Sequence, residues 1–346
     1  MKTRTLLIDG SYLLKRSFHG AKDTYNSKGI HIGAIYQFMT VTRKLIKDHL
    51  INKCIIFWDG QNGGKNRYLL DSQYKANRKS KDWHNKIELS EAEIKREKEK
   101  EESLLYQRIK IKNYCEELFL RNIEADESEA DDLIAQYCLD HNNIEEIFLY
   151  TNDRDFAQLL DLNITIIFGN ITEAVNKTNY MMHFNHHYSN ALTLKIICGD
   201  AGDNVKGIEG IQEGTLLKNF PELTYKHLTV REICQKADEI NKERILNKQK
   251  PLKALENLVH GVKRLRLNFK LVSLREPMLN EEAIEALNQL EMPLNPEDRG
   301  SKNLLKLMNE DEFLNAYGST FVQYVEPFYT VIMNEKQILS EYLGKK

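Results

Sequence analysis

Four short apolar runs, each rich in β-branched residues, mark the first half of the chain. They are TLLID, ending at Asp9, CIIFWD, ending at Asp59, EIFLYTND, ending at Asp153, and ITIIFG, starting at Ile164. Runs of this length and composition are typical of strands buried on both faces. The segments between them have helical spacing, as in 32–49 and 130–140. This alternation predicts an α/β domain whose mostly parallel, twisted sheet is flanked by helices.

Three of the four predicted strands end on an aspartate. Ligands of open α/β sheets bind outside the carboxyl ends of the strands, so we expect Asp9, Asp59 and Asp153 to converge on one crevice. Strand ends are exposed and polar in many proteins, and a single aspartate there would carry little weight. Three at corresponding positions favour a shared crevice.

The pattern changes between about residues 75 and 112. This segment is dense in charges of both signs and almost free of apolar residues before Leu104, so it cannot be core. One interpretation is a solvated helix with ion pairs four residues apart. The other is an inserted segment that contacts a polyanion. The second is favoured by the basic start of the segment, with Lys75, Arg78, Lys79 and Lys81.

After Leu192 the strand signal fades and helical patterns continue to the end, with two basic stretches at 241–253 and 260–270. We therefore predict two domains. Residues 1–195 would form the α/β domain with the charged insertion at about 75–112, and residues 196–346 a helical region.

The overall charge is balanced, with 51 acids against 49 lysines and arginines in 346 residues. A nucleic-acid partner would therefore need local basic patches. The five cysteines are scattered and form no CxxC pair, which argues against a disulfide framework or a zinc knuckle and fits a reducing compartment. The start MKTRTLLIDG does not resemble a signal peptide, and no apolar run approaches twenty residues. We expect a cytoplasmic protein without a membrane segment.

A first group of acids lies in DESEADDLIAQYCLD, where Glu129, Asp131 and Asp132 begin a predicted helix and Ser128 is a candidate N-cap. Acids in a first helical turn suit the helix dipole, so capping could explain two of them. It explains three poorly, because like charges repel unless a cation neutralises them.

A second group is Asp153 and Asp155 in TNDRDFAQLL, where alternate residues at a strand end point the same way. An acidic cap on the following helix is the alternative. A third group, Asp200 and Asp203, precedes the glycine-rich stretch up to Gly214. A solvated turn would also explain that composition.

Nine carboxylates could thus converge, and histidine and cysteine are absent from their motifs. Hard oxygen ligands favour Mg²⁺ or Mn²⁺ over zinc, and two such ions can support phosphodiester hydrolysis. The sequence therefore predicts a metal-dependent phosphohydrolase site. The candidate ligands are Asp9, Asp59, Glu129, Asp131, Asp132, Asp153, Asp155, Asp200 and Asp203.

The ordered series of motifs resembles the 5′ nucleases, or flap endonucleases. LLIDGSYLLKRSF, FWDG, YKANR, SEADDLIA, TNDRDFAQLL and GDAGDNVKGIEGIQEG follow the order and spacing of that family over about residues 4–275. The stretch beginning FKLVSLREPML is similar to the phage branch, which includes the phage ribonuclease H enzymes. The resemblance implies a PIN-like nuclease core with a helical arch insertion and a helical C-terminal region carrying a helix–hairpin–helix-like motif.

The resemblance also implies roles for individual residues. Ligands of a first metal ion would be Asp9, Asp59, Glu129 and Asp131, and those of a second Asp153, Asp155 and Asp200, with Asp132 and Asp203 acting through water. Lys75 and Arg78, at the base of the arch, would polarise the scissile phosphate. Trp83 would either stack on a base or pack on its own helix.

The glycine-rich stretch resembles the hairpin with which this family grips duplex DNA, with a K⁺ ion bound to its carbonyls. The family commonly has glycine in place of Gln212 and a basic residue near Gly214, and both departures weaken the expected K⁺ site and phosphate contact. Candidate DNA-binding residues are Lys206, Gly207, Gly210, Gly214, Thr215 and Lys218.

The predicted function is a structure-specific 5′→3′ nuclease that acts during DNA replication on 5′ flaps, DNA 5′ ends or RNA primers. Its expected partners are such DNA, RNA–DNA hybrids and replication proteins, and the expected state is a monomer in the cytoplasm, the host's if the gene is phage-encoded. A PIN-like ribonuclease and a catalytically inactive DNA-binding protein remain the alternatives. A haloacid-dehalogenase-type phosphatase would need an acid where Ser11 stands.

Overall fold

The centre of the protein is a five-stranded parallel sheet. The computed structural model describes residues 2–21, 24–77, 90–297 and 299–344. The strands are β1 (Thr3–Asp9), β2 (Lys53–Asp59), β3 (Arg121–Ala125), β4 (Glu145–Thr151) and β5 (Thr165–Phe168), in the order β3-β2-β1-β4-β5. The chain leaves β1 toward β2 on one side and later returns to β4 on the other. The strand order therefore reverses beside β1, where open α/β sheets bind ligands.

The four predicted strands are confirmed, but β3 was missed. Its sequence, RNIEA, alternates buried and half-buried residues, so it has no apolar run. Arg121 is buried in β3 because Glu335 accepts hydrogen bonds from two of its guanidinium nitrogens at 2.6 and 2.9 Å. A buried ion pair of this kind leaves no signal in the hydrophobic pattern.

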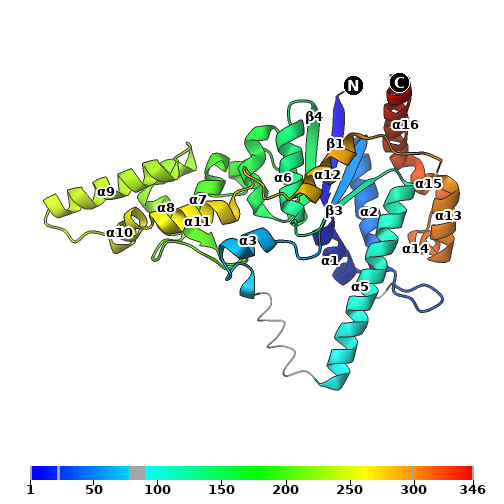
Figure 1. Cartoon of the computed structure of the whole chain (residues 1–346), viewed down its shortest axis with the longest axis horizontal. Helices are drawn as coiled ribbons and strands as arrows, with labels where there is room; N and C mark the ends of the chain where they lie inside the picture. Colours follow the sequence, from blue (N-terminus) through cyan, green and yellow to red (C-terminus); the bar gives the residue numbers. More distant parts are fainter. Residues whose placement is uncertain (1, 22–23, 78–89, 298, 345–346) are drawn as a thin grey trace.

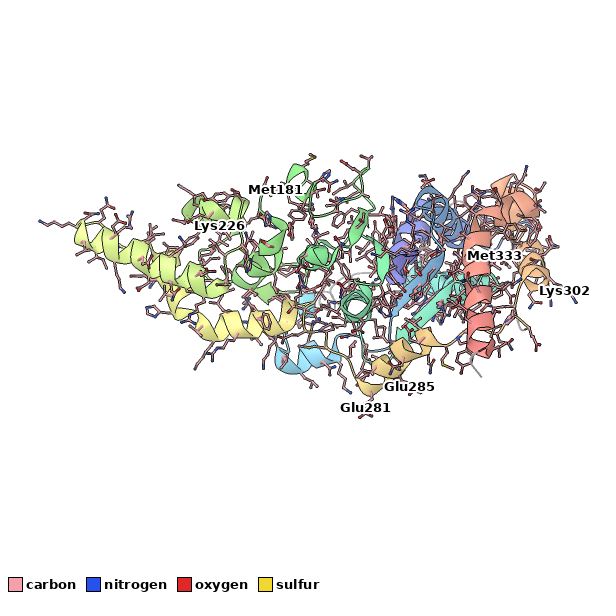
Figure 2. All side chains as sticks on the ribbon, turned by 90° about the horizontal axis from the view of Figure 1, so that it is seen from above. Met181, Lys226, Glu281, Glu285, Lys302 and Met333 are labelled. Carbon is pink, nitrogen blue, oxygen red and sulfur yellow. The ribbon has the colours of Figure 1, made fainter. Side chains whose placement is uncertain are left out.

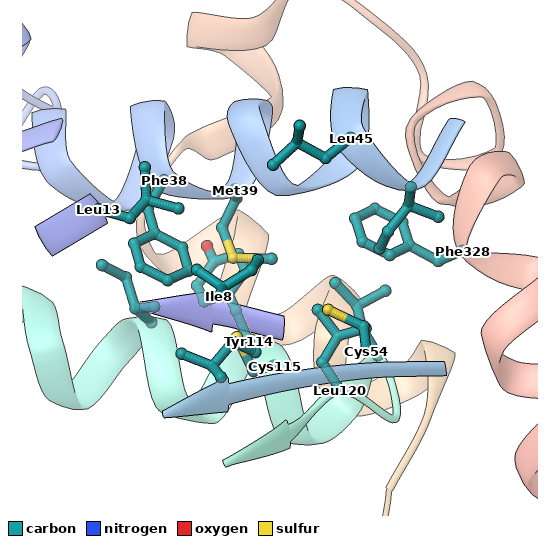
Figure 3. Packing of buried hydrophobic residues seen from close by; sticks show 14 of the residues in the cluster. Ile8, Leu13, Phe38, Met39, Leu45, Cys54, Tyr114, Cys115, Leu120 and Phe328 are labelled. Atoms are coloured by element: carbon teal, nitrogen blue, oxygen red, sulfur yellow. The ribbon is translucent and has the colours of Figure 1, made fainter. Parts of the chain in front are cut away.

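Helices cover both faces of the sheet. One face packs against α1 (Gly10–Gly20), α2 (Gly33–Asp48) and the C-terminal part of α5 (Glu91–Glu117), and the other packs against α6 (Ala130–His141). Figure 3 shows the first of these cores, where Phe38 and Met39 of α2 lie close to Ile8 of β1 and Tyr114 of α5. The predicted helices at 32–49 and 130–140 correspond to α2 and α6 and are confirmed.

The predicted charged insertion is helical over most of its described length. Helix α5 begins with a capping box formed by Ser90 and Glu93 and projects from the body as a long arm (Figure 1). Its base is fixed by Gln107, whose side-chain oxygen accepts hydrogen bonds from the first N–H groups of α2, at Ala34 and Ile35. Residues 78–89, which include Arg78, Lys79, Lys81 and Trp83, lie outside the described residues.

The helical C-terminal half contains two groups of helices. Helices α7 (Ala191–Cys198), α8 (Glu213–Asn219), α9 (Val230–Leu246), α10 (Lys253–His260) and α11 (Val262–Val272) surround a third core. The later helices return to the sheet, and they are α12 (Glu281–Asn288), α13 (Ser301–Glu310), α14 (Phe313–Tyr317), α15 (Phe321–Val325) and α16 (Tyr329–Gly344). The division at residue 195 stays a prediction, but packing places the last seventy or so residues with the α/β core.

The remaining elements are short. They are α3 (Lys65–Leu70), the two-stranded ribbon of β6 (Gly199–Asp200) and β7 (Val205–Lys206), and the 3₁₀ helices η1 (Arg154–Leu162), η2 (Tyr180–Met182), η3 (Tyr188–Asn190), η4 (Pro221–Thr224), η5 (Gln289–Glu291) and η6 (Glu326–Phe328). None of the helices within the described ranges is long and apolar enough to cross a membrane.

Candidate active site

A cleft of about 450 Å³ opens at the carboxyl ends of β1, β2 and β4. Most of its polar wall consists of carboxylates, accompanied by two lysines, a tyrosine, a serine and an asparagine. The lining residues are Asp9, Ser11, Tyr12, Lys15, Asp59, Lys75, Asp131, Asn152, Asp153, Asp200, Gly202 and Asp203. The predicted convergence of the strand-end acids on one crevice is therefore confirmed.

Each strand-end aspartate also caps a neighbouring helix. Asp9 accepts a hydrogen bond from the N–H of Tyr12 at 2.9 Å, Asp59 from that of Ala130 at 3.0 Å, and Asp153 from that of Asp155 at 2.8 Å. These contacts use one oxygen of each carboxylate. Capping and convergence on the cleft are thus two roles of the same side chains, because a helix begins beside the end of each strand.

The predicted N-cap at Ser128 is wrong. Glu129 occupies the N-cap position of α6 and makes no side-chain cap bond there. The carboxylate of Asp59 satisfies the first N–H group of the helix instead, while the Ser128 hydroxyl is buried near Asn280. The capping partner comes from a strand 70 residues away, which local sequence spacing does not reveal.

Mutual repulsion is strongest around Asp131. Its pKa is raised well above the usual range, first by burial and then by the charges of Asp153 and Asp9. The pKa of Asp9 is raised to about 7, again by burial and by the carboxylates of Asp59 and Asp153. Carboxylates that hinder one another's ionisation in this way make a site that favours a bound cation.

Lys75 enters the same cleft from the other side. Its ammonium group pairs with Glu129 and lies 3.9 Å from Asp203, and its backbone N–H donates to the Asp203 carbonyl at 2.8 Å. Burial alone would lower the pKa of Lys75, but Glu129 and Asp203 raise it above its ordinary value. Lys75 therefore stays protonated at neutral pH.

A second lysine, which the sequence reasoning missed, pairs with two other predicted ligands. Lys195 of α7 pairs with Asp155 and lies 2.7 Å from Asp200. Lys195 and Asp200 oppose the effect of burial on each other, so the pKa of Lys195 is raised and that of Asp200 is lowered. The sequence contained one indication of this contact, which is that Lys195 lies in the helix that leads directly to Asp200.

Asp132 does not reach the cleft. Only 1% of its surface is exposed, and Arg67 of α3 binds it through two nitrogens, one of them 2.8 Å from Oδ1. The same guanidinium donates to Glu129 at 2.6 Å and to the carbonyl of Leu271 at 2.8 Å. On a helix, adjacent residues point in different directions, so Asp132 faces the junction of α3, α6 and α11 while Asp131 faces the cleft.

Within the described part of the chain, no three His, Cys, Asp or Glu side chains are arranged so that they could hold a metal ion as they stand. The charges of the cleft residues explain why these acids are not gathered around one point. Glu129, Asp155 and Asp200 are each held by a lysine, and the remaining acids repel one another.

The glycine-rich stretch forms a tight hairpin between α7 and α8. A side chain at Gly207 would lie 2.1 Å from the carbonyl oxygen of Cys198, so only glycine fits there, and Gly210 has a φ of +81°. Gly214 meets no such restriction, because nothing lies within 4 Å of a Cβ at that position. Lys206 and Lys218 are exposed at either end of the hairpin. Their contacts with DNA stay predictions.

Residues 4–187, just over half of the chain, match the family model described as 5′-3′ exonuclease, N-terminal resolvase-like domain. A 5′-3′ exonuclease of Mycoplasmopsis pulmonis is 27% identical over 312 residues, which cover 85% of this chain and 95% of the relative.

Two solved structures of bacteriophage T5 proteins share the fold. The T5 5′-exonuclease with bound zinc ions has a TM-score of 0.60 and 20% identity, covering 90% of this chain and 99% of that one. The T5 flap endonuclease complex with DNA and metal ions has a TM-score of 0.59 and 19% identity, covering 93% and 99%. The fold of a PIN-like nuclease core with added helical regions is confirmed. The chain belongs to the 5′-3′ exonuclease family and is a nuclease.

Proposed function

We propose that this nuclease hydrolyses phosphodiester bonds at the 5′ flaps and 5′ ends of DNA, and of RNA primers paired with DNA, with two Mg²⁺ or Mn²⁺ ions held in the cleft. The observation that carries the proposal is the convergence of Asp9, Asp59, Asp131 and Asp153 on one cleft, where burial and the neighbouring carboxylates raise the pKa values of Asp9 and Asp131. Divalent ions bound to the related T5 exonuclease, and DNA bound to the T5 flap endonuclease, support it.

The ligand set fits hard divalent ions. The lining residues of the cleft include no histidine or cysteine, and carboxylate oxygens are the ligands that Mg²⁺ and Mn²⁺ prefer. Bound ions would activate a water molecule and stabilise charge on the phosphate oxygens. Asp9, Asp59, Glu129 and Asp131 would hold the first ion, and Asp153, Asp155 and Asp200 the second, with Asp203 in contact through water.

The basic side chains of the cleft would position the substrate. Lys75 stays protonated beside the acids and is held there by Glu129, so its ammonium group can donate to an oxygen of the scissile phosphate. Lys15 and Tyr12 line the same cleft and offer further donors. Lys195 forms ion pairs with both Asp155 and Asp200 and so keeps these two predicted ligands near each other.

The hairpin would hold the duplex part of the substrate. The close fit at Gly207 and the positive φ of Gly210 shape the turn that would lie against the phosphates, and backbone contacts with phosphates do not depend on base sequence. K⁺ would bind the carbonyl oxygens of the same turn. Gln212 is exposed at the N-cap of α8 and makes no side-chain cap bond there.

The decisive experiment is cleavage of a 5′-labelled flap substrate with Mg²⁺, with Mn²⁺ and with EDTA, resolved by product length. The wild type should give products near the flap junction that EDTA abolishes, and Asp155→Asn should abolish them too. Glu285→Gln is the matched control, because Glu285 is an exposed acid on α12 (Figure 2) that does not line the cleft. Mononucleotide products alone would establish an exonuclease without flap cleavage. Binding without cleavage in either metal would refute the proposal, and cleavage of single-stranded RNA alone would identify a ribonuclease.

A further inference from the structure

The largest local excess of positive charge lies outside the cleft, between residues 241 and 270. The acids there are Glu243 and Glu256 alone, in a chain whose acids otherwise balance its bases. The bases are Lys242, Arg244, Lys248, Lys250, Lys253, Lys263, Arg264, Arg266 and Lys270. No acid occurs from residue 244 to residue 255, the stretch that joins α9 to α10.

The basic turn, defined as residues 247–253, has a fixed conformation. The buried side chain of Asn241 donates to the carbonyl of Leu252 at 3.2 Å and accepts from its N–H at 2.8 Å. Arg244 Nε donates to the carbonyl of Lys250 at 2.9 Å, and the N–H of Gln249 donates to the carbonyl of Arg244 at 2.8 Å. The turn is thus ordered by backbone and amide contacts, which leave the lysine side chains free to bind an anion.

Lys248 and Lys250 are exposed, and neither forms an ion pair with any residue that the structure describes. The other bases near the turn are partly compensated, since Lys242 pairs with Asp238 and Lys253 with Glu256. Two uncompensated lysines two residues apart on a rigid turn repel each other. An external anion would relieve that repulsion.

The basic turn adjoins the glycine hairpin. Asn257 of α10 donates to the carbonyl of Glu209 at 3.1 Å, and a Cβ at Gly210 would lie 3.3 Å from the Cβ of Ala254. The stretch from Lys248 to Ala254 can span at most about 20 Å, so the basic turn lies within one helical turn of B-form DNA from the hairpin. Figure 1 shows α9 and α10 at the end of the molecule that lies farthest from α16.

We propose that the basic turn is a second contact for duplex DNA, which binds the sugar–phosphate backbone beyond the glycine hairpin and within one helical turn of it. This inference rests on the proposed DNA substrate and deepens it. Duplex DNA presents evenly spaced phosphates, and the turn adjoins the hairpin with lysines that form no ion pair within the described part of the chain. Ile245 and Leu246, 59% and 83% exposed, would also suit an acidic protein partner. The connection to the hairpin favours DNA.

The test measures binding of flap substrates with duplex arms of increasing length, by fluorescence anisotropy in EDTA over a range of salt concentrations. The test variant is Lys248→Ala with Lys250→Ala. The matched control is Lys302→Ala with Lys306→Ala, a pair of exposed lysines on α13 at the opposite end of the molecule, where Figure 2 shows Lys302.

On long duplex arms, the slope of log K against log salt should be smaller by about 2 for the test variant than for the wild type, because two phosphate contacts are lost. On arms too short to reach the turn, the test variant and the wild type should bind alike. The control should keep the wild-type slope at every length.

Equal slopes for the test variant and the wild type at every length would overturn the inference. An equal loss at every length would also overturn it, because the turn would then not lie beyond the hairpin. The proposed function is judged separately by cleavage of the short-arm substrate in Mg²⁺, where the test variant should match the wild type. A wild type that binds but does not cut would refute the function and leave the salt slopes to decide the inference.

Discussion

The two sides of helix α6 bury carboxylates in opposite ways. On one side Asp131 faces the cleft, where Asp9, Asp59 and Asp153 surround it and its pKa is raised. On the other side Asp132 faces the junction of α3, α6 and α11, where Arg67 binds it through two nitrogens. The two residues are adjacent in sequence and chemically identical.

The difference shows what distinguishes a structural acid from a functional one. At the junction the cation belongs to the chain, so burial of Asp132 is compensated in the folded protein itself. At the cleft the carboxylates around Asp131 outweigh the positive charge of Lys75, so folding without an external cation is unfavourable there. The junction around Arg67 therefore contributes mainly to the stability of the protein, and the cleft around Asp131 contributes mainly to ion binding. Substitutions at the junction should lower stability and spare activity, and substitutions at the cleft should do the reverse.

The largest expected effect is on stability, in Arg67→Met. Removal of the guanidinium leaves Asp132 and Glu129 buried without their partner, which should lower the free energy of unfolding by about 3–5 kcal/mol. Urea denaturation measures this directly. Arg266→Met, at an exposed position on α11, is the control and should stay within about 0.5 kcal/mol of the wild type. A loss below about 1 kcal/mol for Arg67→Met would show that the junction is not a main source of stability.

Asp131→Asn should separate activity from stability. Loss of one cleft carboxylate should reduce the cleavage rate at least ~10²-fold, while the free energy of unfolding in EDTA stays the same or rises, because a repelling charge is gone. Asp132→Asn is the neighbouring control and should do the reverse, with a clear loss of stability and cleavage retained by the folded fraction. If both variants lose stability alike, the distinction between the two sides of α6 is wrong.

The same comparison explains what the sequence could and could not predict about the fold. Apolar runs identified β1, β2, β4 and β5, because strands buried on both faces need such runs. The pattern missed β3, where Arg121 is buried with Glu335, since a long-range ion pair has no local signature. The packing of α12 to α16 against the sheet was missed for a similar reason. The hydrophobic periodicity of a helix predicts that one of its faces is buried, but it does not predict which element covers that face.

The candidate site was predictable to the extent that it depends on topology. Parallel strands bring their carboxyl ends together, so Asp9, Asp59 and Asp153 could be placed in one cleft from the sequence. The direction of Asp132 could not be predicted, because its partner Arg67 lies 65 residues away. Lys195 was overlooked because a lone lysine in a helix is usually solvated, and only the folded structure places it between Asp155 and Asp200.

A third expected effect is a pH dependence of stability in the protein without metal. The pKa of Asp9 is raised from an ordinary value of 3.8 to about 7, and that of Asp155 to about 8. A carboxyl whose pKa is higher in the folded state stabilises the fold fully below its unfolded pKa, and this contribution is lost as pH rises through the folded value. In EDTA, these two groups should therefore lower the free energy of unfolding progressively between about pH 4 and pH 8.

Other groups titrate in the same range, so the measurement is a difference between the wild type and Asp9→Asn. Asparagine can still accept the hydrogen bond from the N–H of Tyr12, so the cap of α1 is retained. The stability of Asp9→Asn relative to the wild type should rise as the pH increases from 4 to 8 in EDTA. Mg²⁺ at about 100 times its Kd should stabilise the wild type by about 2.7 kcal/mol at pH 8 and by less at pH 5, where the acids are protonated. A difference between the two proteins that does not change with pH would mean that Asp9 is not held among uncompensated charges.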